Sequence, residues 1–140
     1  MADRAPHRLP VRVYYEDTDA GGIVYHSNYL KYAERGRTEL LREAGFEHAN
    51  LMQEYGAGFA VRRCTLDFVK PAVLDDALIV ETEIARIRGA SVEMRQKILR
   101  DGALVADVEI HVALIDRHGR PKRLPDPLAA AMRAVAPLEA

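Results

Sequence analysis

The sequence predicts an α+β fold in which one long helix packs against an antiparallel sheet of five strands. From about residue 27 to residue 44, apolar residues recur at helical spacing and form one face of a helix about five turns long. After residue 57 the period falls to two, and four segments alternate apolar and polar residues. One further strand precedes the helix, so the order strand, helix, four strands places the helix on one face of the sheet.

Composition and charge exclude several classes of protein. The chain has 140 residues, of which 49% are hydrophobic and 29% charged, and we expect residues 1–140 to form one domain with a loose terminus over residues 1–8. A formal charge of −1 lacks the excess of positive charge that is typical of nucleic-acid-binding proteins. No apolar run approaches the roughly 20 residues of a membrane span.

Cysteine usage indicates a reducing compartment. Cys64 is the only cysteine, so no internal disulfide can form, and no export signal opens the chain. We therefore expect a cytoplasmic protein. Because Cys64 lies in an apolar-rich run, we expect it to be a small buried thiol.

The N-terminal half begins with a strand and a turn. Residues 11–16 have the β-branched and aromatic content of a strand, and the Asp and Gly residues of 17–22 end it. Ser27 is the expected N-cap of the long helix, and Gly45 the expected left-handed C-cap.

The C-terminal half predicts hairpins. A short helix over residues 49–55 precedes strands over residues 58–69, 76–87, 91–100 and 103–115, and Asp126 is the expected cap of a last helix. Turns at residues 88–90 and 101–102 make the last three strands antiparallel neighbours. A single helix about 27 Å long shields only part of such a sheet. The uncovered surface and an edge strand favour dimerisation.

The densest set of reactive groups lies between the first strand and the long helix. Within eleven residues it supplies a carboxylate, Asp19 being the main candidate, a histidine, His26, and the unpaired amides of a helix N-terminus. These are a nucleophile or base, a proton carrier and an oxyanion site for acyl transfer. The alternative is structural: an Asx turn at the aspartates and a capping role for the histidine. No metal is expected, because the spacing matches no metal-ligand motif.

The string of residues 11–30, VRVYYEDTDAGGIVYHSNYL, continued by Tyr32-Ala-Glu-Arg35 and Arg37-Thr-Glu-Leu-Leu-Arg42, resembles a known family. Residues 68–72, 74–76 and 88–91 extend the likeness along most of the chain. The family is that of the YbgC-like, Tol-Pal-associated acyl-CoA thioesterases of the 4-hydroxybenzoyl-CoA thioesterase class. The resemblance implies a hot-dog fold, in which the sheet wraps the long helix and two subunits join their sheets.

The resemblance also implies roles for individual residues. The active aspartate falls on Asp19 and the histidine on His26, with the backbone amides near Tyr25 and His26 on the thioester carbonyl oxygen. The aspartate either attacks the thioester directly or activates water, and both mechanisms stay open. Glu16 and Asp17 are expected to be structural. The residues expected to contact substrate are Gly22, Asn28, Lys70, Arg88 and Ser91.

The expected activity is hydrolysis of an acyl-CoA thioester to a free acid and CoA, with no cofactor. The expected assembly is a homodimer or homotetramer, and acyl carrier protein is a further expected partner. Two alternatives stay open: a non-catalytic acyl-CoA-binding module, and a hot-dog enoyl-CoA hydratase or dehydratase. Release of free thiol from acyl-CoA distinguishes hydrolysis from both.

Overall fold

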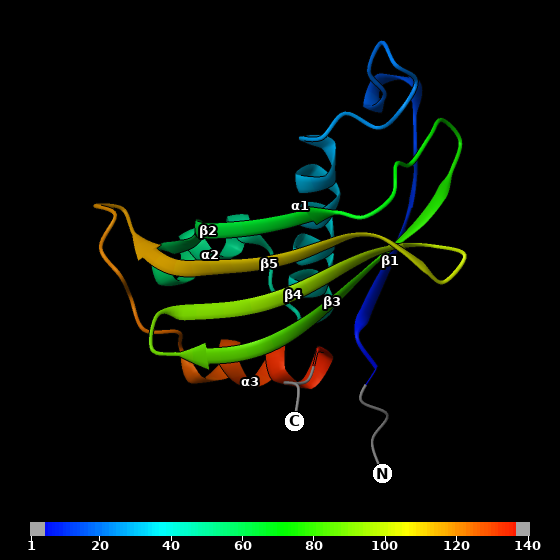
Figure 1. The fold of residues 1–140 in the computed structure, drawn as a ribbon. Coiled ribbons are helices and arrows are strands. Elements are labelled where there is room, and N and C mark those ends of the chain that lie inside the picture. Colours follow the sequence, from blue (N-terminus) through cyan, green and yellow to red (C-terminus); the bar gives the residue numbers. More distant parts are fainter. Residues whose placement is uncertain (1–4, 137–140) are drawn as a thin grey trace.

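The computed structural model describes residues 5–136, in which an antiparallel sheet curves around the long helix α1 (Figure 1). The five strands of this part of the chain are β1 (His7–Arg12), β2 (Ala57–Phe68), β3 (Ala77–Arg88), β4 (Ser91–Arg100) and β5 (Ala103–Asp116). The helices are η1 (Tyr15–Asp17), α1 (Asn28–Glu43), α2 (His48–Tyr55) and α3 (Asp126–Val135). The order β1-β3-β4-β5-β2 makes β1 and β2 the two edges of the sheet.

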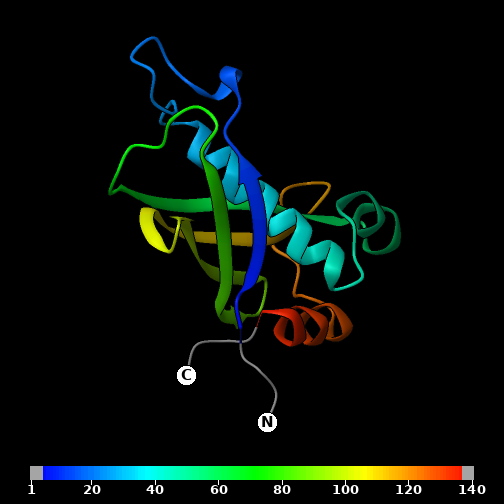
Figure 2. The same cartoon turned by 90° about the vertical axis from the view of Figure 1, so that its right-hand side faces the viewer.

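Helix α1 lies across the inner face of the sheet (Figure 2). Its apolar face is buried, as the helical spacing predicts, with Ala33 and Leu40 at most 1% exposed. The helix packs tightly against the sheet at Gly36, where a Cβ atom would stand only 2.8 Å from Val80 Cγ1. The helix ends at Gly45 with φ of +95°, which confirms the predicted left-handed cap. Ser27 occupies the N-cap position, but its side chain makes no capping hydrogen bond.

The inner face of the sheet forms the core with the helices. Along β4, buried Val92, Met94, Gln96 and Ile98 alternate with more exposed neighbours, as the period of two predicts. Helix α2 packs on β2 and α3 packs on β3, so the three helices share one side of the sheet. The bounds of β2 to β5 agree with the sequence prediction to within one residue.

The first strand differs from its prediction. The sequence predicts a strand over residues 11–16, whereas β1 spans His7–Arg12 and residues 15–17 form a 3-10 turn. The chain leaves the sheet because the Asp17 carboxylate accepts a hydrogen bond from the Tyr14 amide at 2.8 Å, which closes the turn. The strand therefore begins inside the segment expected to be a loose terminus. Residues 1–4 of that segment lie outside the described part of the chain.

The two edges of the sheet differ in character. Edge β1 is short and contains Pro10, which cannot donate a ladder hydrogen bond. Edge β2 is 12 residues long, contains no proline, and is exposed along most of its length. Cys64 lies on this edge and is exposed, so the expectation of a buried thiol is wrong: no strand covers β2 on its outer side in the described chain. Among residues 5–136, no helix is long and apolar enough to cross a membrane.

Candidate active site

A buried carboxylate holds the loop that joins β1 to α1. Asp17 is 4% exposed, and besides the Tyr14 amide it accepts a hydrogen bond from Asn28 Nδ2 at 2.8 Å. Its backbone carbonyl accepts a third bond, from the Tyr25 amide at 2.8 Å. Since Asn28 is the first residue of α1, these bonds fasten the loop to the start of the helix.

Asp19 lies on this loop in an Asx turn. Its Oδ1 atom accepts hydrogen bonds from the Gly21 amide at 2.8 Å and from the Ile23 amide at 3.4 Å. The Asx turn, which was the structural alternative for Asp19, is therefore present and uses one of its two carboxylate oxygens. The other oxygen, Oδ2, accepts no hydrogen bond from residues 5–136, and the side chain is exposed. The turn thus orients the carboxylate and leaves one oxygen free for chemistry.

His26 follows at the N-terminal end of α1. Its ring stacks at a tilt on the Tyr25 ring, with the centroids 4.3 Å apart, and presents an edge to Phe68 at 6.5 Å. The Tyr25 amide is occupied by the Asp17 carbonyl and is not free for a ligand. Within the described chain the amides of His26 and Ser27 donate no hydrogen bond. The candidate oxyanion donors are therefore the amides of His26 and Ser27, and the amide of Tyr25 is not one of them.

Asp19 and His26 border the same cavity. It has a volume of about 410 Å³ and lies between the loop, the first turn of α1 and the end of β2. Lys70 lies on its rim, so three of the residues expected from the sequence meet here. The remaining lining is mostly apolar: Ile23, Val24, Tyr29, Phe68, Val69 and Pro71.

The other expected contacts lie elsewhere. Gly22 borders a neighbouring depression that also includes Asp19. Asn28 is 6% exposed and is bound to Asp17, so its side chain acts inside the loop and does not line the cavity. Arg88 and Ser91 are paired across the β3–β4 turn, and Ser91 lines a separate cavity on the sheet. That cavity is lined by Arg62, Arg63, Ser91 and His111.

Sequence reasoning did not find two contributors to the cavity. Tyr29 is 3% exposed, and its hydroxyl accepts a hydrogen bond from the Ala72 amide at 3.2 Å. Phe68, at the end of β2, packs edge-on against both Tyr29 and His26. Tyr29 was visible in the sequence only as part of the apolar helix face. Phe68 is 42 residues from His26 and 49 from Asp19, and no local pattern connects it with the loop.

The arrangement suits attack on a polarised carbonyl group. A free carboxylate oxygen supplies a nucleophile or a base, and unpaired amides at a helix N-terminus stabilise a developing oxyanion. The imidazole beside them is able to carry a proton. Among residues 5–136, no three His, Cys, Asp or Glu side chains are grouped to hold a metal ion.

Comparison with known proteins defines the class. The model of the thioesterase-like superfamily matches residues 13–132, and the chain belongs to this superfamily. A crystal structure from Bartonella henselae, described as a "Probable Thioesterase", superposes with a TM-score of 0.84 at 40% identity. That match covers 86% of this chain and all of the other. The predicted hot-dog fold is confirmed by this likeness and by the sheet wrapped around α1.

Two sequence relatives define the group within that class. The acyl-CoA thioester hydrolase YbgC of Escherichia coli O6:H1 is 45% identical over 125 residues, covering 88% of this chain and 92% of the relative. The acyl-CoA thioesterase YbgC of Haemophilus influenzae is 44% identical over 108 residues, covering 77% of this chain and 79% of the relative. The chain is a member of the YbgC family.

Proposed function

We propose that this protein hydrolyses acyl-CoA thioesters to a free acid and CoA at the cavity beside Asp19 and His26. One observation carries the proposal: Asp19 borders the same cavity as the start of α1, and its Oδ2 atom has no hydrogen-bond partner in the described chain. The names of the YbgC relatives support the same substrate class. The His26 and Ser27 amides, which have no hydrogen-bond partner in the described chain, are the proposed donors to the thioester carbonyl oxygen.

The two mechanisms that the sequence leaves open, direct attack and activation of water, use the same groups. In one, Asp19 Oδ2 attacks the carbonyl carbon, the carbon–sulfur bond breaks, and water then hydrolyses the mixed anhydride. In the other, Asp19 takes a proton from water, which attacks the carbonyl carbon itself. In each, the thiolate of CoA leaves and takes up a proton, for which His26 is the nearby carrier. Removing one oxyanion donor from an unrelated hydrolase costs about 3 to 4 kcal/mol, so free amides contribute substantially.

The Asp19→Asn variant tests this proposal. An amide is neither a nucleophile nor a base, so we expect kcat to fall at least about a hundredfold while the fold is retained. The measurement is release of free thiol from a panel of acyl-CoAs, with circular dichroism as the check on folding. Glu16→Gln, which neutralises an exposed carboxylate on the same loop, is the matched control.

Each outcome distinguishes one class of function. Unchanged turnover in Asp19→Asn rejects the assigned role of Asp19. Binding of acyl-CoA by the wild type without thiol release supports the non-catalytic module instead. Hydration of an enoyl-CoA without thiol release supports the hydratase.

The wider setting of the activity is also part of this proposal. Lys70 lines the cavity, which supports it as the proposed cation for CoA, whereas Arg88 and Ser91 do not line it. We propose a homodimer or a homotetramer built on edge β2. A cytoplasmic location agrees with the CoA substrate and the unpaired Cys64. Acyl carrier protein, which also carries acyl groups as thioesters, is a second proposed partner.

A further inference from the structure

Asp17 is a buried acidic residue that the proposed mechanism does not use. It is 4% exposed, whereas its neighbours Glu16 and Asp19 are exposed. Burying an ionised carboxylate is costly unless hydrogen bonds or an opposite charge compensate for it. Both carboxylate oxygens of Asp17 accept a hydrogen bond, Oδ2 from the Tyr14 amide and Oδ1 from the Asn28 side chain, each at 2.8 Å. The loop is therefore built around a compensated buried carboxylate.

Asp17 binds both ends of the turn that contains the free amides. The Asn28 amide donates to the Tyr25 carbonyl at 2.8 Å, which closes a turn from Tyr25 to Asn28. The Tyr25 amide donates to the Asp17 backbone carbonyl, and the Asn28 side chain donates to the Asp17 carboxylate, each at 2.8 Å. His26 and Ser27 are the central residues of this turn, and their amides have no partner in the described chain. A single residue thus fixes the turn from both sides.

The turn is not held by an ordinary helix cap. Ser27 is the N-cap residue of α1, but its side chain makes no capping hydrogen bond. Such a side chain normally binds an amide of the first helical turn and fixes the helix start. Here the Asp17 carboxylate binds the helix start from outside, through Asn28, the first residue of α1.

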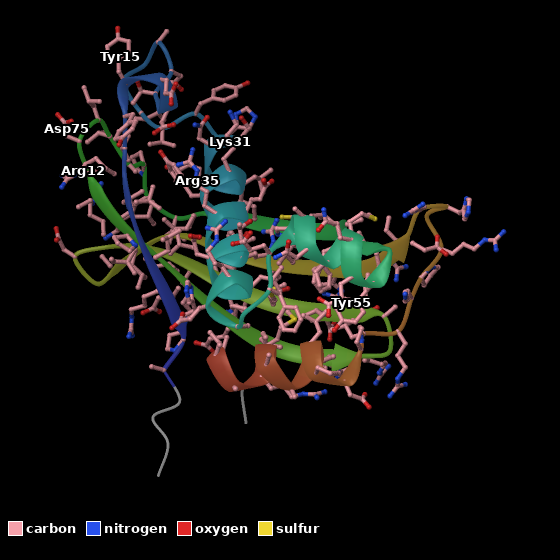
Figure 3. All side chains as sticks on the ribbon, turned by 180° about the vertical axis from the view of Figure 1, so that it is seen from behind. Arg12, Tyr15, Lys31, Arg35, Tyr55 and Asp75 are labelled. Atoms are coloured by element: carbon pink, nitrogen blue, oxygen red, sulfur yellow. The ribbon has the colours of Figure 1, made fainter. Side chains whose placement is uncertain are left out.

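The loop projects from the body of the protein, and α1 supports it beside Asp17. Figure 3 shows Tyr15 at the outer end of the loop, beyond the part of α1 where Lys31 is labelled. On the helix side, Tyr32 is fully buried beside Asp17, and the Arg35 guanidinium lies 5.8 Å from the centre of the Tyr32 ring. Burial and the neighbouring Asp17 carboxylate raise the pKa of Tyr32, so its hydroxyl stays protonated. The carboxylate is therefore enclosed between its own loop and the early part of α1.

We propose that Asp17 and Asn28 are positioning residues, which hold the turn so that its two free amides reach the thioester carbonyl oxygen. The inference rests on the proposed thioesterase function and adds residues that set its rate without touching the substrate. Neither residue lines the cavity beside Asp19, and both are at most 6% exposed. Asp17, for which the sequence suggests only a structural role, thereby contributes to stabilising the transition state.

The direction of the two amides is the property that this pair controls. Oxyanion donors are effective when they are aimed in advance at the oxygen that becomes negatively charged. A displacement of about 1 Å at a reacting group can cost about a hundredfold in rate. The donors are backbone groups, so a side-chain substitution at Asn28 changes their direction and leaves the donors themselves in place.

The kinetic test is Asn28→Ala, which removes one of the two bonds that tie the turn to Asp17. We expect kcat to fall about tenfold to a hundredfold and KM to change by no more than about threefold, because an oxyanion contact strengthens in the transition state. Thiol release measures both constants. Asn50→Ala, the same substitution at an exposed position of α2, is the matched control. Ile84→Val, at a buried position of β3, is the control for lost stability alone.

The carbonyl stretching frequency of a bound thioester reports the amide contacts directly, because hydrogen bonds to the carbonyl oxygen lower it. The probe is the acyl-CoA that the wild type hydrolyses fastest, labelled with ¹³C at the thioester carbon and bound to Asp19→Asn, in which it stays intact. We expect difference infrared spectra to show a lower frequency for the bound label than for the free acyl-CoA. Adding Asn28→Ala should return most of this shift. A merely structural role predicts the same frequency in both proteins.

Exchange of the two side chains is a rescue test. Asn28→Asp alone places two carboxylates against each other and should reduce kcat at least as much as Asn28→Ala. In the double variant, Asp17→Asn with Asn28→Asp, the hydrogen bond forms again with its direction reversed, and the Tyr14 amide still has an oxygen to bind. We expect its kcat to lie within about fivefold of the wild type. The exchange keeps the shape of the buried contact, so it tests the inference even where Asn28→Ala does not fold.

The outcomes separate this inference from the proposed function. A wild-type kcat in folded Asn28→Ala, or an unchanged carbonyl frequency, overturns the positioning role and leaves the hydrolase in place. A double variant that folds like the wild type but keeps the low kcat of Asn28→Asp overturns it as well. Absence of thiol release from every acyl-CoA in the wild type rejects the proposed function, and the positioning role with it.

Discussion

At the residue scale, Asp17 and Asp19 show how two aspartates two positions apart acquire different roles. Asp17 is buried and fully engaged by the Tyr14 amide and the Asn28 side chain, whereas Asp19 is exposed and bound through only one oxygen. Both are aspartates of the same Asp-Thr-Asp string. Because of this difference in burial, Asp17 holds the loop in place and Asp19 is a candidate reactive group.

His26 is the second residue whose role is testable alone. Its ring lies on the cavity and its amide lies at the helix start, and His26→Ala removes the ring while keeping the amide. We expect kcat to fall about tenfold to a hundredfold, less than in Asp19→Asn, because the oxyanion donor stays. The measurement is the pH–rate profile of thiol release. A variant with the wild-type profile shows that the imidazole takes no part.

Gly36 is the residue on which the contact of α1 with the sheet depends. A Cβ atom there would lie 2.8 Å from Val80 Cγ1 and 3.1 Å from Thr82 Oγ1. We expect Gly36→Ala to lower the free energy of unfolding by about 1–3 kcal/mol, the usual cost of overpacking. Denaturant titration measures it. Gly58→Ala is the control, since its Cβ would lie 3.7 Å from Met52 Cε and should change stability by no more than about 0.5 kcal/mol.

At the scale of elements, the Asp19 loop depends on the segment before β3. The Val24 amide donates to the Ala72 carbonyl at 2.8 Å, and Ile23 forms a bridge with Val73. Asp76 closes this segment by accepting from the Val73 amide at 2.9 Å and from Arg100 at 2.6 Å. Burial alone would raise the pKa of Asp76, but these two donors outweigh it and lower the pKa below its ordinary value.

The lowered pKa of Asp76 predicts a pH dependence of stability. A carboxylate with a depressed folded-state pKa stabilises the fold above its unfolded-state pKa, and this contribution is lost as pH falls through the folded-state pKa. We expect Asp76→Asn to unfold more easily at pH 7, by about 1 kcal/mol. The difference from the wild type should shrink in acid. Thermal melts at several pH values measure it, with Asp101→Asn in an exposed turn as the control. A difference that does not change with pH contradicts the assignment.

The helices and strands also show which features can be predicted from the sequence. The alternation in β4 and β5 and the helical period of α1 are local patterns, and both predictions are confirmed to within one residue. The start of β1 is not local, because His7 to Arg12 form a strand by pairing with β3, some 70 residues later. The turn at residues 15–17 likewise depends on the burial of Asp17. A local sequence pattern does not reveal long-range strand pairing or burial.

At the scale of the whole molecule, the sheet has one protected edge and one unprotected edge. The long exposed edge β2 is the reason to expect a twofold assembly. We expect size-exclusion chromatography with light scattering to give a dimer or a tetramer. A stable monomer that hydrolyses acyl-CoA would contradict the proposed assembly on edge β2.

The sequence by itself determined the α+β class, the order of the elements, the family resemblance and the position of the reactive loop, because these depend on local period and on a contiguous motif. The tertiary structure decided which amide is free at the helix start, which acidic residue is buried, and that Asn28, Arg88 and Ser91 do not border the Asp19 cavity. It also brought Phe68 to His26 and exposed Cys64 on an open edge. These depend on contacts between residues far apart in the chain, which form only when the sheet closes around α1.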